Sequence, residues 1–190
     1  MDKQLLHLSS PIPASVNHYL GTRAILKNGK PMAMVYETKE AKDYKKWFAS
    51  YIKEEVKKQN WDIELNPTQH FYCDCVFYFD RIDKDCNNYF KLLLDAITET
   101  QLIWTDDNVV CERVNRIYYD AKNPRIEIQI YPVDYIGIFD CQYDLDKFED
   151  NCKTCKRYKR NCSILNKAKE GRIQEEINNF ECNKYKEVKL

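Results

Sequence analysis

The sequence predicts an α/β protein with two main helices, followed by a small cysteine-rich module. Segments in which apolar residues alternate, as in strands, stand before and after segments in which they recur three and four apart, as in helices. After Pro132 this pattern weakens, and five of the nine cysteines follow. We therefore expect an α/β domain over residues 1–133 and a separate module over residues 134–190.

The first part of the chain predicts a short strand, a loop and a long helix. Leu5 to Leu8 is the expected strand, and residues 11–30 are an expected loop with a hairpin near Asn28-Gly29. Thr38 is a good cap for a helix that runs to about Lys58. Its expected buried stripe consists of Tyr44, Trp47, Phe48, Tyr51 and Ile52.

The centre of the chain predicts a strand followed directly by a second helix. Residues 70–79 alternate, and one face of that strand carries only Phe71, Cys73, Cys75, Phe77 and Phe79. Asn87 or Asn88 is the expected cap of the helix. The expected core stripe of this helix consists of Phe90, Leu93, Leu94 and Ile97. The strand cysteines, Cys111 included, are expected to be small buried apolar residues.

Two further strands are expected at residues 109–119 and 125–131. The segment between them, Asp120-Ala121-Lys122-Asn123-Pro124, is typical of a turn. We therefore expect these two strands to form a hairpin.

Acidic residues stand on both sides of the second helix. Asp83 and Asp85 come just after the preceding strand, and Asp106 and Asp107 lie in a short polar turn after the helix. The two turns are expected to face each other across the helix N-terminus. Mg²⁺ prefers oxygen ligands and is normally held by one or two carboxylates together with substrate phosphates. The arrangement indicates a metal site that cuts phosphodiesters, with an ordinary solvated connection as the alternative.

A lysine occupies an unexpected place near the start of this helix. Asn87, Lys91 and Asp95 are four residues apart, so they lie along one side of it. A cation near a helix N-terminus opposes the macrodipole, at a cost of roughly 0.3–1 kcal/mol. Helix stability therefore does not explain Lys91. A lysine beside a metal site would neutralise charge on a reacting phosphate.

These motifs resemble the signature of the RusA family of Holliday-junction resolvases. The family pattern is D-x-D-N-x-x-K, then D-A-L, then a D-D turn. It is similar to Asp85-x-Asn87-Asn88-x-x-Lys91, Asp95-Ala96-Ile97 and Asp106-Asp107. The opening Pro11-Ile12-Pro13-Ala14-Ser15-Val16-Asn17 is similar to the proline-rich start of the family. The similarity spans about residues 5 to 132 and leaves out the cysteine-rich extension.

The resemblance implies a RusA-like mixed sheet and a homodimeric, Mg²⁺-dependent crossover junction endodeoxyribonuclease. Such an enzyme resolves four-way junctions or other branched DNA in recombination and repair. Carried over to this sequence, Asp85, Lys91 and Asp107 are the essential groups, and Asp106, beside Asp107, is a further candidate metal ligand.

One position departs from the family pattern. Asn87 stands where the second aspartate is expected, and its amide oxygen can bind Mg²⁺ or Mn²⁺ but supplies no charge. Asp83 points to the same side of an extended chain as Asp85 and is a candidate replacement. The alternative function is a catalytically weakened or inactive protein of the same fold that binds branched DNA.

The formal net charge is +0, which is unusual for a protein that binds nucleic acid. Any DNA-binding surface must therefore be a local patch. The candidates are Lys84, Lys153, Lys156, Arg157, Lys159 and Arg160. Arg113, Asn115 and Tyr119 are further candidates, with a solvated strand face as the alternative. The neutral balance leaves a protein-binding adaptor as a third class of function.

The cysteine-rich module predicts a structural zinc site. Cys152-x-x-Cys155, Cys162 and Cys182 are spaced as thiolate ligands for tetrahedral Zn²⁺, with Cys141 as the alternative fourth ligand. A helix over residues 163–178 is expected to connect the last two ligands. Zinc would supply roughly 10–16 kcal/mol of folding energy that so small a segment lacks. A redox pair, unligated thiols and an iron–sulfur cluster are the alternatives.

Kinases, P-loop proteins and Rossmann-type proteins are excluded. Four glycines form no phosphate-binding loop, and the three histidines have no partner pattern for a hydrolase triad. No signal peptide or membrane span is recognised, because Asp2 and Lys3 interrupt the first apolar residues. We therefore expect a cytoplasmic protein, without a membrane partner, whose cysteines are reduced or metal-bound.

Overall fold

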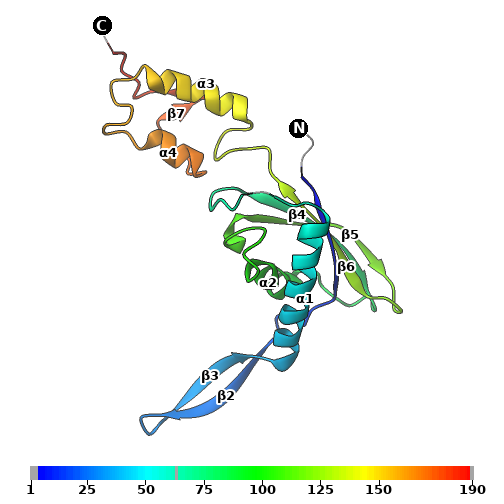
Figure 1. The fold of residues 1–190 in the computed structure, drawn as a ribbon. Helices are drawn as coiled ribbons and strands as arrows, with labels where there is room; N and C mark the ends of the chain where they lie inside the picture. Colours follow the sequence, from blue (N-terminus) through cyan, green and yellow to red (C-terminus); the bar gives the residue numbers. More distant parts are fainter. Residues whose placement is uncertain (1–3, 63, 189–190) are drawn as a thin grey trace. The chain divides into compact units, whose positions relative to one another are not determined.

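The computed structural model describes residues 4–62 and 64–188, and the chain divides into two compact units, Met1–Pro132 and Val133–Leu190. The first unit combines a sheet with two helices (Figure 1). Its elements are β1 (Leu6–Pro11), β2 (Leu20–Lys27), β3 (Lys30–Glu37), α1 (Lys39–Lys58), β4 (Phe71–Phe79), α2 (Asn87–Thr98), the 3-10 helix η1 (Asp107–Val109), β5 (Val110–Tyr119) and β6 (Arg125–Pro132).

The main sheet has the strand order β1-β6-β4-β5. Strand β4 pairs parallel to β5 and antiparallel to β6, and β1 pairs antiparallel to β6. The expected mixed sheet is therefore confirmed. Because β4 and β5 run parallel, they start side by side, at Phe71 and Val110, and end side by side, at Phe79 and Tyr119.

The predicted hairpin between residues 109–119 and 125–131 is wrong. Both strands form, but β4 lies between them and pairs with each. Asp120, in the connecting turn, donates its backbone N–H to the carbonyl of Phe79 over 2.7 Å, so the chain passes around the end of β4. Strand β4 is thus an interior strand, with β5 along one of its edges and β6 along the other, and it has buried residues on both faces.

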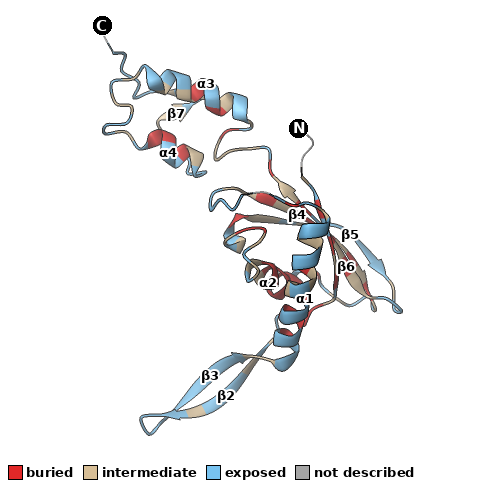
Figure 2. Cartoon of the chain, viewed as in Figure 1, coloured by how far each residue is buried: buried red, intermediate tan, exposed pale blue. Residues whose placement is uncertain are grey.

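Helices α1 and α2 share one core with the apolar face of the sheet (Figure 2). All five apolar residues predicted for that face of β4 are buried, as is the whole predicted stripe of α2. Tyr44, Phe48 and Ile52 of α1 are buried too, but Trp47 is 47% exposed. Its ring instead stacks on Phe48 and Tyr51, so the predicted stripe is one residue too wide.

The start of α2 differs from the prediction by one residue. Asn87 is the first helical residue, and the cap position belongs to Cys86, whose side chain makes no capping hydrogen bond. Asp85 compensates, because its Oδ1 accepts the backbone N–H of Asn87 over 3.0 Å. The prediction that Asn87 or Asn88 caps the helix is therefore wrong, and Asp85 takes part in starting the helix.

The hairpin expected near Asn28-Gly29, at the end of the predicted loop over residues 11–30, is present and extends from Leu20 to Glu37. Strands β2 and β3 form a two-stranded hairpin that is exposed on both faces (Figure 2). The predicted turn at Asn28-Gly29 is confirmed, with φ values of 53° and 74°. Positive φ at both central residues is the geometry that joins strands with the normal twist. Because both strands are exposed, they need no alternation of apolar and polar residues, so the sequence predicts the hairpin but not the length of its strands.

The second unit contains two helices and a very short hairpin. Its elements are α3 (Gln142–Lys153), α4 (Ile164–Lys169), β7 (Ile177–Asn178) and β8 (Glu181–Cys182). The predicted helix over 163–178 is wrong beyond Lys169. Gly171, at φ +79°, ends it and donates its backbone N–H to Ala168 over 3.1 Å. No helix in the described parts of either unit is long and apolar enough to cross a membrane.

A charged cluster stabilises the other face of the sheet. Asp74 is only 8% exposed, and it accepts hydrogen bonds from Arg113 Nε (2.5 Å) and from the Tyr131 hydroxyl (2.9 Å). The Arg113 guanidinium lies over the ring of Tyr72, 3.7 Å from its centroid. Burial opposes ionisation of Asp74, but these hydrogen bonds outweigh it and lower its pKa.

Replacing Arg113 by alanine is expected to lower the free energy of unfolding by about 2 kcal/mol, because it leaves a nearly buried carboxylate without its cation. A folded-state pKa below the ordinary value means that the contribution of Asp74 is present at neutral pH and is lost as the pH falls through that lowered pKa. The difference between wild type and Arg113→Ala in urea unfolding should therefore shrink on acidification. Arg116→Ala is the matched control, since Arg116 hydrogen-bonds Tyr118 on its own strand. An equal loss of unfolding free energy in both variants would contradict the stabilising role of the Arg113–Asp74 pair.

Candidate active site

The first predicted acidic turn precedes α2, and the second leads into η1. Helices α2 and η1 contact each other. Asp85 immediately precedes the helix, and its Oδ1 is held by the Asn87 backbone N–H. Asp107 is the first residue of η1, and Asp106 caps that turn by accepting the Asn108 N–H over 3.0 Å. Asp106 therefore has a structural role that accounts for its place in the motif, whereas Asp107 does not cap this turn.

Lys91 connects the helix to the second acidic turn. Its Nζ donates to Asp95 Oδ1 over 2.7 Å and lies 3.4 Å from Asp107 Oδ2. The hydrogen bond to Asp95 raises the pKa of Lys91; partial burial opposes this, and Asp107 adds to it. Lys91 is therefore a fixed cation at neutral pH, with a side chain 53% exposed to an incoming ligand.

Asp83 is turned toward another partner. Its two carboxylate oxygens accept from Arg81, with Nε to Oδ1 at 3.0 Å and Nη2 to Oδ2 at 2.9 Å. A bidentate pair of this kind occupies both oxygens of the carboxylate. The replacement of the missing aspartate by Asp83, suggested by its spacing from Asp85, therefore lacks support from the side-chain contacts.

The chemistry of the predicted donor set fits a hard divalent cation. Asp85, Asn87 and Asp107 offer carboxylate and amide oxygens, which Mg²⁺ and Mn²⁺ accept, and all three are at least partly exposed. Across residues 4–62 and 64–188, however, no three or more His, Cys, Asp or Glu side chains stand close enough together to hold a metal ion. Metal binding at this place would therefore draw on Asn87, the substrate and water as well as the carboxylates.

The model of the family described as endodeoxyribonuclease RusA matches residues 11–131. The chain belongs to this family. The match confirms the resemblance seen in the motifs, and it includes both acidic turns and Lys91. A search of curated proteins finds no match. The RusA family match ends where the first compact unit ends, so it does not extend to the cysteine-rich unit.

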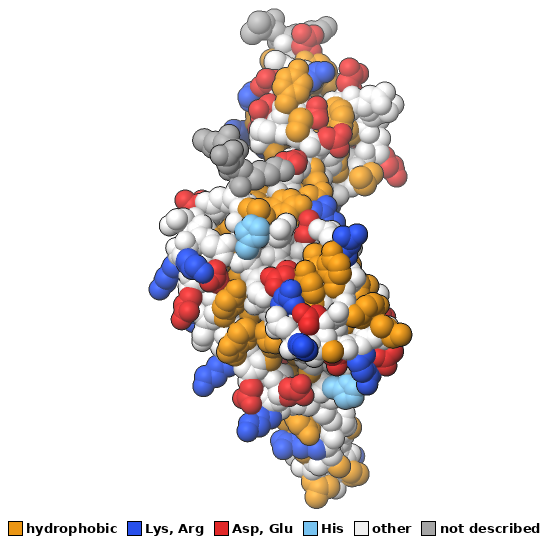
Figure 3. Space-filling model, turned by 90° about the vertical axis from the view of Figure 1, so that its right-hand side faces the viewer, with side chains coloured by type: hydrophobic (Ala, Val, Ile, Leu, Met, Phe, Trp, Pro, Cys, Tyr) orange, Lys and Arg blue, Asp and Glu red, His pale blue; other side chains and the backbone are white. Residues whose placement is uncertain are grey.

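Several predicted DNA-binding residues of this RusA family member are paired with acidic side chains. Lys84 forms an ion pair with Asp80 over 2.7 Å, and Lys153 forms one with Asp150 over 2.7 Å. Arg113 is engaged by Asp74. On the face drawn in Figure 3, Lys and Arg side chains alternate with Asp and Glu. The largest group of predicted basic residues without an acidic neighbour in sequence is Lys156, Arg157, Lys159 and Arg160.

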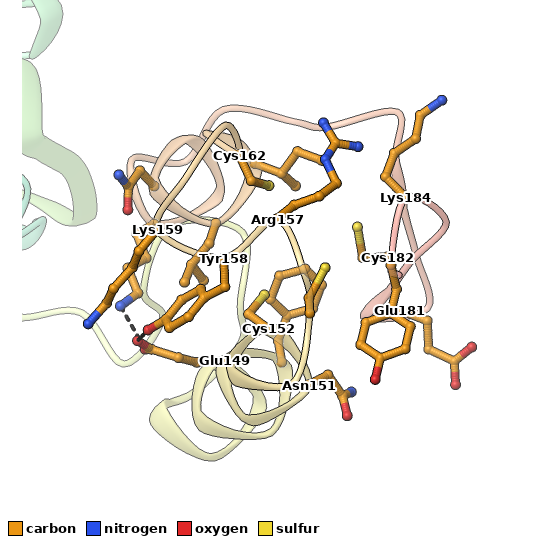
Figure 4. Close-up of a pocket in the computed structure, with 17 residues that line it drawn as sticks. Glu149, Asn151, Cys152, Arg157, Tyr158, Lys159, Cys162, Glu181, Cys182 and Lys184 are labelled. Atoms are coloured by element: carbon orange, nitrogen blue, oxygen red, sulfur yellow. Dashed lines mark hydrogen bonds and ion pairs between the residues drawn. The ribbon is translucent and has the colours of Figure 1, made fainter. Parts of the chain in front are cut away.

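The cysteines of the second unit lie in one place. Cys152, Cys155, Cys162 and Cys182 all line a cavity of about 460 Å³ (Figure 4). Burial raises the pKa of the Cys152 thiol to about 11, and the neighbouring thiols of Cys182, Cys162 and Cys155 add to the shift. Cys141 is not among the described residues of this cavity, and its Sγ lies 3.2 Å from Asp144 Oδ2 at the start of α3.

Asp95 is the residue that the sequence reasoning undervalued. Asp95 follows Lys91 by four residues, a spacing that allows an ion pair, but lysine before aspartate is the weaker order for such a pair in a helix. The second contact, from Lys91 to Asp107, joins residues 16 apart and cannot be read from helical spacing. Together these contacts make Asp95 a residue that positions Lys91.

Proposed function

We propose that this chain is a structure-selective endodeoxyribonuclease that resolves Holliday junctions or other branched DNA by Mg²⁺-dependent hydrolysis of phosphodiester bonds. The observation that carries the proposal is the contact between Lys91 of α2 and Asp107 of the second acidic turn, because both residues lie within the match to an endodeoxyribonuclease family. Partial exposure of both side chains, 53% and 31%, leaves room for a phosphate.

In this proposal Asp85, Asn87 and Asp107 hold Mg²⁺ or Mn²⁺. Such an ion, when bound, activates a water and stabilises the leaving oxygen. Asp95 keeps Lys91 extended toward Asp107, and the hydrogen bond to Asn87 N–H fixes one oxygen of Asp85. Lys91 keeps its proton, so it presents a positive charge to the scissile phosphate and does not act as a base.

The proposal is tested with a labelled four-way junction and a linear duplex of matching sequence, each with and without Mg²⁺. We expect nicks in the junction alone and only in the presence of the metal. Equal cutting of the linear duplex would contradict structure selectivity, and cutting in a chelator would contradict the metal requirement.

We further propose that the active form is a homodimer, since resolving a junction needs two matched nicks and each chain supplies one site. Sedimentation of the protein with and without a junction tests the stoichiometry. The basic run in residues 153–160 is proposed to contact DNA phosphates. If it does, Lys156→Glu with Arg160→Glu should reduce the salt dependence of junction binding, because fewer counterions are released. An unchanged dependence would assign the run to another role.

A weakened or inactive junction-binding protein is the second candidate, and Asn87 is the observation that favours it. Asp83 is paired with Arg81, which argues against its replacing the missing charge. Under the nuclease proposal, Asn87→Asp should lower the Mg²⁺ concentration for half-maximal cutting by about tenfold, since one more charge faces the cation.

Asp83→Asn is the matched control and should leave the metal requirement nearly unchanged. The measurement is a titration of junction cutting with Mg²⁺ and with Mn²⁺. If wild type is inert with both metals while Asn87→Asp cuts, the binding-protein alternative is correct. If Asp83→Asn is as damaging as Asp85→Asn, Asp83 is a ligand after all.

A further inference from the structure

The second unit has a small apolar core for its length. Its buried cluster consists of Phe139, Leu145, Phe148, Leu165 and Ala168, in a unit that spans Val133–Leu190. Units of this size bury a low fraction of their surface and commonly need a disulfide, a metal or a partner. Among the described residues every cysteine is an unbridged thiol. Cys152 and Cys182 pack against the cluster, so the cavity with the cysteines lies next to this core.

The four cysteines of the cavity come from three separate segments. Cys152 and Cys155 stand at the end of α3, Cys162 follows the basic turn, and Cys182 belongs to β8. Figure 4 shows the sulfur atoms of Cys152, Cys162 and Cys182 directed toward a common space. A ligand that bound all four would tie the end of α3, the 156–162 turn and the β7–β8 hairpin to one point.

The backbone around these cysteines forms tight turns. Cys155 N–H donates to the Cys152 carbonyl over 2.9 Å, and Tyr185 N–H donates to the Cys182 carbonyl over 3.1 Å. The Lys186 N–H lies 3.4 Å from Cys155 Sγ and donates to it. Backbone donors of this kind orient sulfur ligands and stabilise their anionic form. The bond to Cys155 therefore suits a thiolate better than a neutral thiol.

The charges around the cavity also suit an anionic cluster. Four thiolates around a divalent cation carry a net charge of −2. The lining contains the cationic side chains of Arg157, Lys159, Lys169 and Lys184 and the acidic side chains of Glu149 and Glu181. Glu149, an acidic residue of the same lining, is neutralised by Lys169 over 2.8 Å and accepts from the Tyr158 hydroxyl over 3.1 Å. The surroundings therefore offset the excess negative charge.

We propose that Cys152, Cys155, Cys162 and Cys182 bind one Zn²⁺ in a closed tetrathiolate site that stabilises the second unit. The thiols release their protons on binding, and zinc undergoes no redox change. Because no three described Cys side chains already form a group that could hold a metal ion, their sulfur atoms must move closer together on loading. The site is structural, since four protein ligands leave no open position for a substrate.

The test uses the full chain purified without chelator. Elemental analysis should find one zinc per chain, and replacement by Co²⁺ should give the intense visible and near-ultraviolet bands of a tetrahedral thiolate complex. Cys152→Ser and Cys182→Ser should lose the metal, whereas Cys141→Ser should keep it. Iron with acid-labile sulfide would overturn the proposal in favour of a cluster. Absence of zinc together with failure to bind Co²⁺ would overturn it outright.

Alkylation of the wild-type chain tests the same proposal if a serine variant fails to fold. Alkylation followed by mass mapping should be slowed at least about tenfold at the four cavity cysteines when zinc is loaded rather than chelated, because bound thiolates are poor nucleophiles. Cys141 is the internal control and should alkylate at the same rate in both states. Protection of Cys141 in place of Cys182 would overturn the ligand set. These readouts do not involve DNA cutting, so they are independent of the nuclease proposal.

Discussion

Asp85→Asn and Asp107→Asn are each expected to abolish junction cutting while junction binding stays near normal. Each change keeps the shape of the side chain but removes a charge from a site that already contains Asn87 in place of a carboxylate. Metal activation of water and leaving group supplies several kcal/mol, so losing about 4 kcal/mol corresponds to a loss of about a thousandfold in rate. Single-turnover cutting and gel-shift binding of the same labelled junction measure both properties.

Asp106→Asn and Asp83→Asn are the matched controls for this experiment. Asp106 caps η1, and an asparagine oxygen can accept the same N–H from Asn108, so cutting should change little. Asp83 is paired with Arg81 on the surface, so its loss should also be mild. If the two controls were as inactive as the Asp85 and Asp107 variants, the acidic turns would act only through their total charge. Undiminished cutting by an Asp85→Asn, Asp107→Asn double variant would contradict the assignment of these two residues to the active site.

The parts of the fold that sequence predicts best are those in which burial is periodic. The stripe of α2 and the alternation of β4 each place apolar residues on one face, and packing preserves those patterns. The pairing of β5 and β6 could not be predicted in the same way. The turn at residues 120–124 looks the same whether the strands beside it pair with each other or with a strand inserted between them.

The candidate site divides in a similar manner. Helical spacing identified Asn87, Lys91 and Asp95 as neighbours, and family resemblance supplied Asp107. The contact of Lys91 with Asp107 and the pairing of Asp83 with Arg81 depend on side-chain directions in turns, where no periodicity constrains them. Likewise, cysteine spacing left Cys141 and Cys182 as alternatives. Only the cavity distinguishes them, since Cys182 lines it and Cys141 contacts Asp144.

Lys91→Ala is expected to slow cutting by about 10²–10³-fold, the usual effect of removing one preorganised charge from a reacting group. Lys91 forms the link between Asp95 and Asp107, so its loss also frees the Asp107 carboxylate to move. Metal affinity should not fall, because removing a cation reduces repulsion of Mg²⁺. The rate at saturating metal should therefore fall, while the metal concentration for half-maximal cutting should not rise.

Lys91→Arg and Asp95→Asn separate charge from position. Arginine keeps the charge but not the compact ammonium group, so we expect a loss of about tenfold at most. Asp95→Asn removes the main partner that raises the pKa of Lys91 and should lower the rate less than Lys91→Ala does. Because that pKa lies above its ordinary value in wild type, cutting should show no decline with pH from deprotonation of Lys91 across the neutral and mildly alkaline range. A fall in rate near neutral pH that Lys91→Arg abolished would mean that Lys91 titrates there, and its assignment as a fixed cation would be wrong.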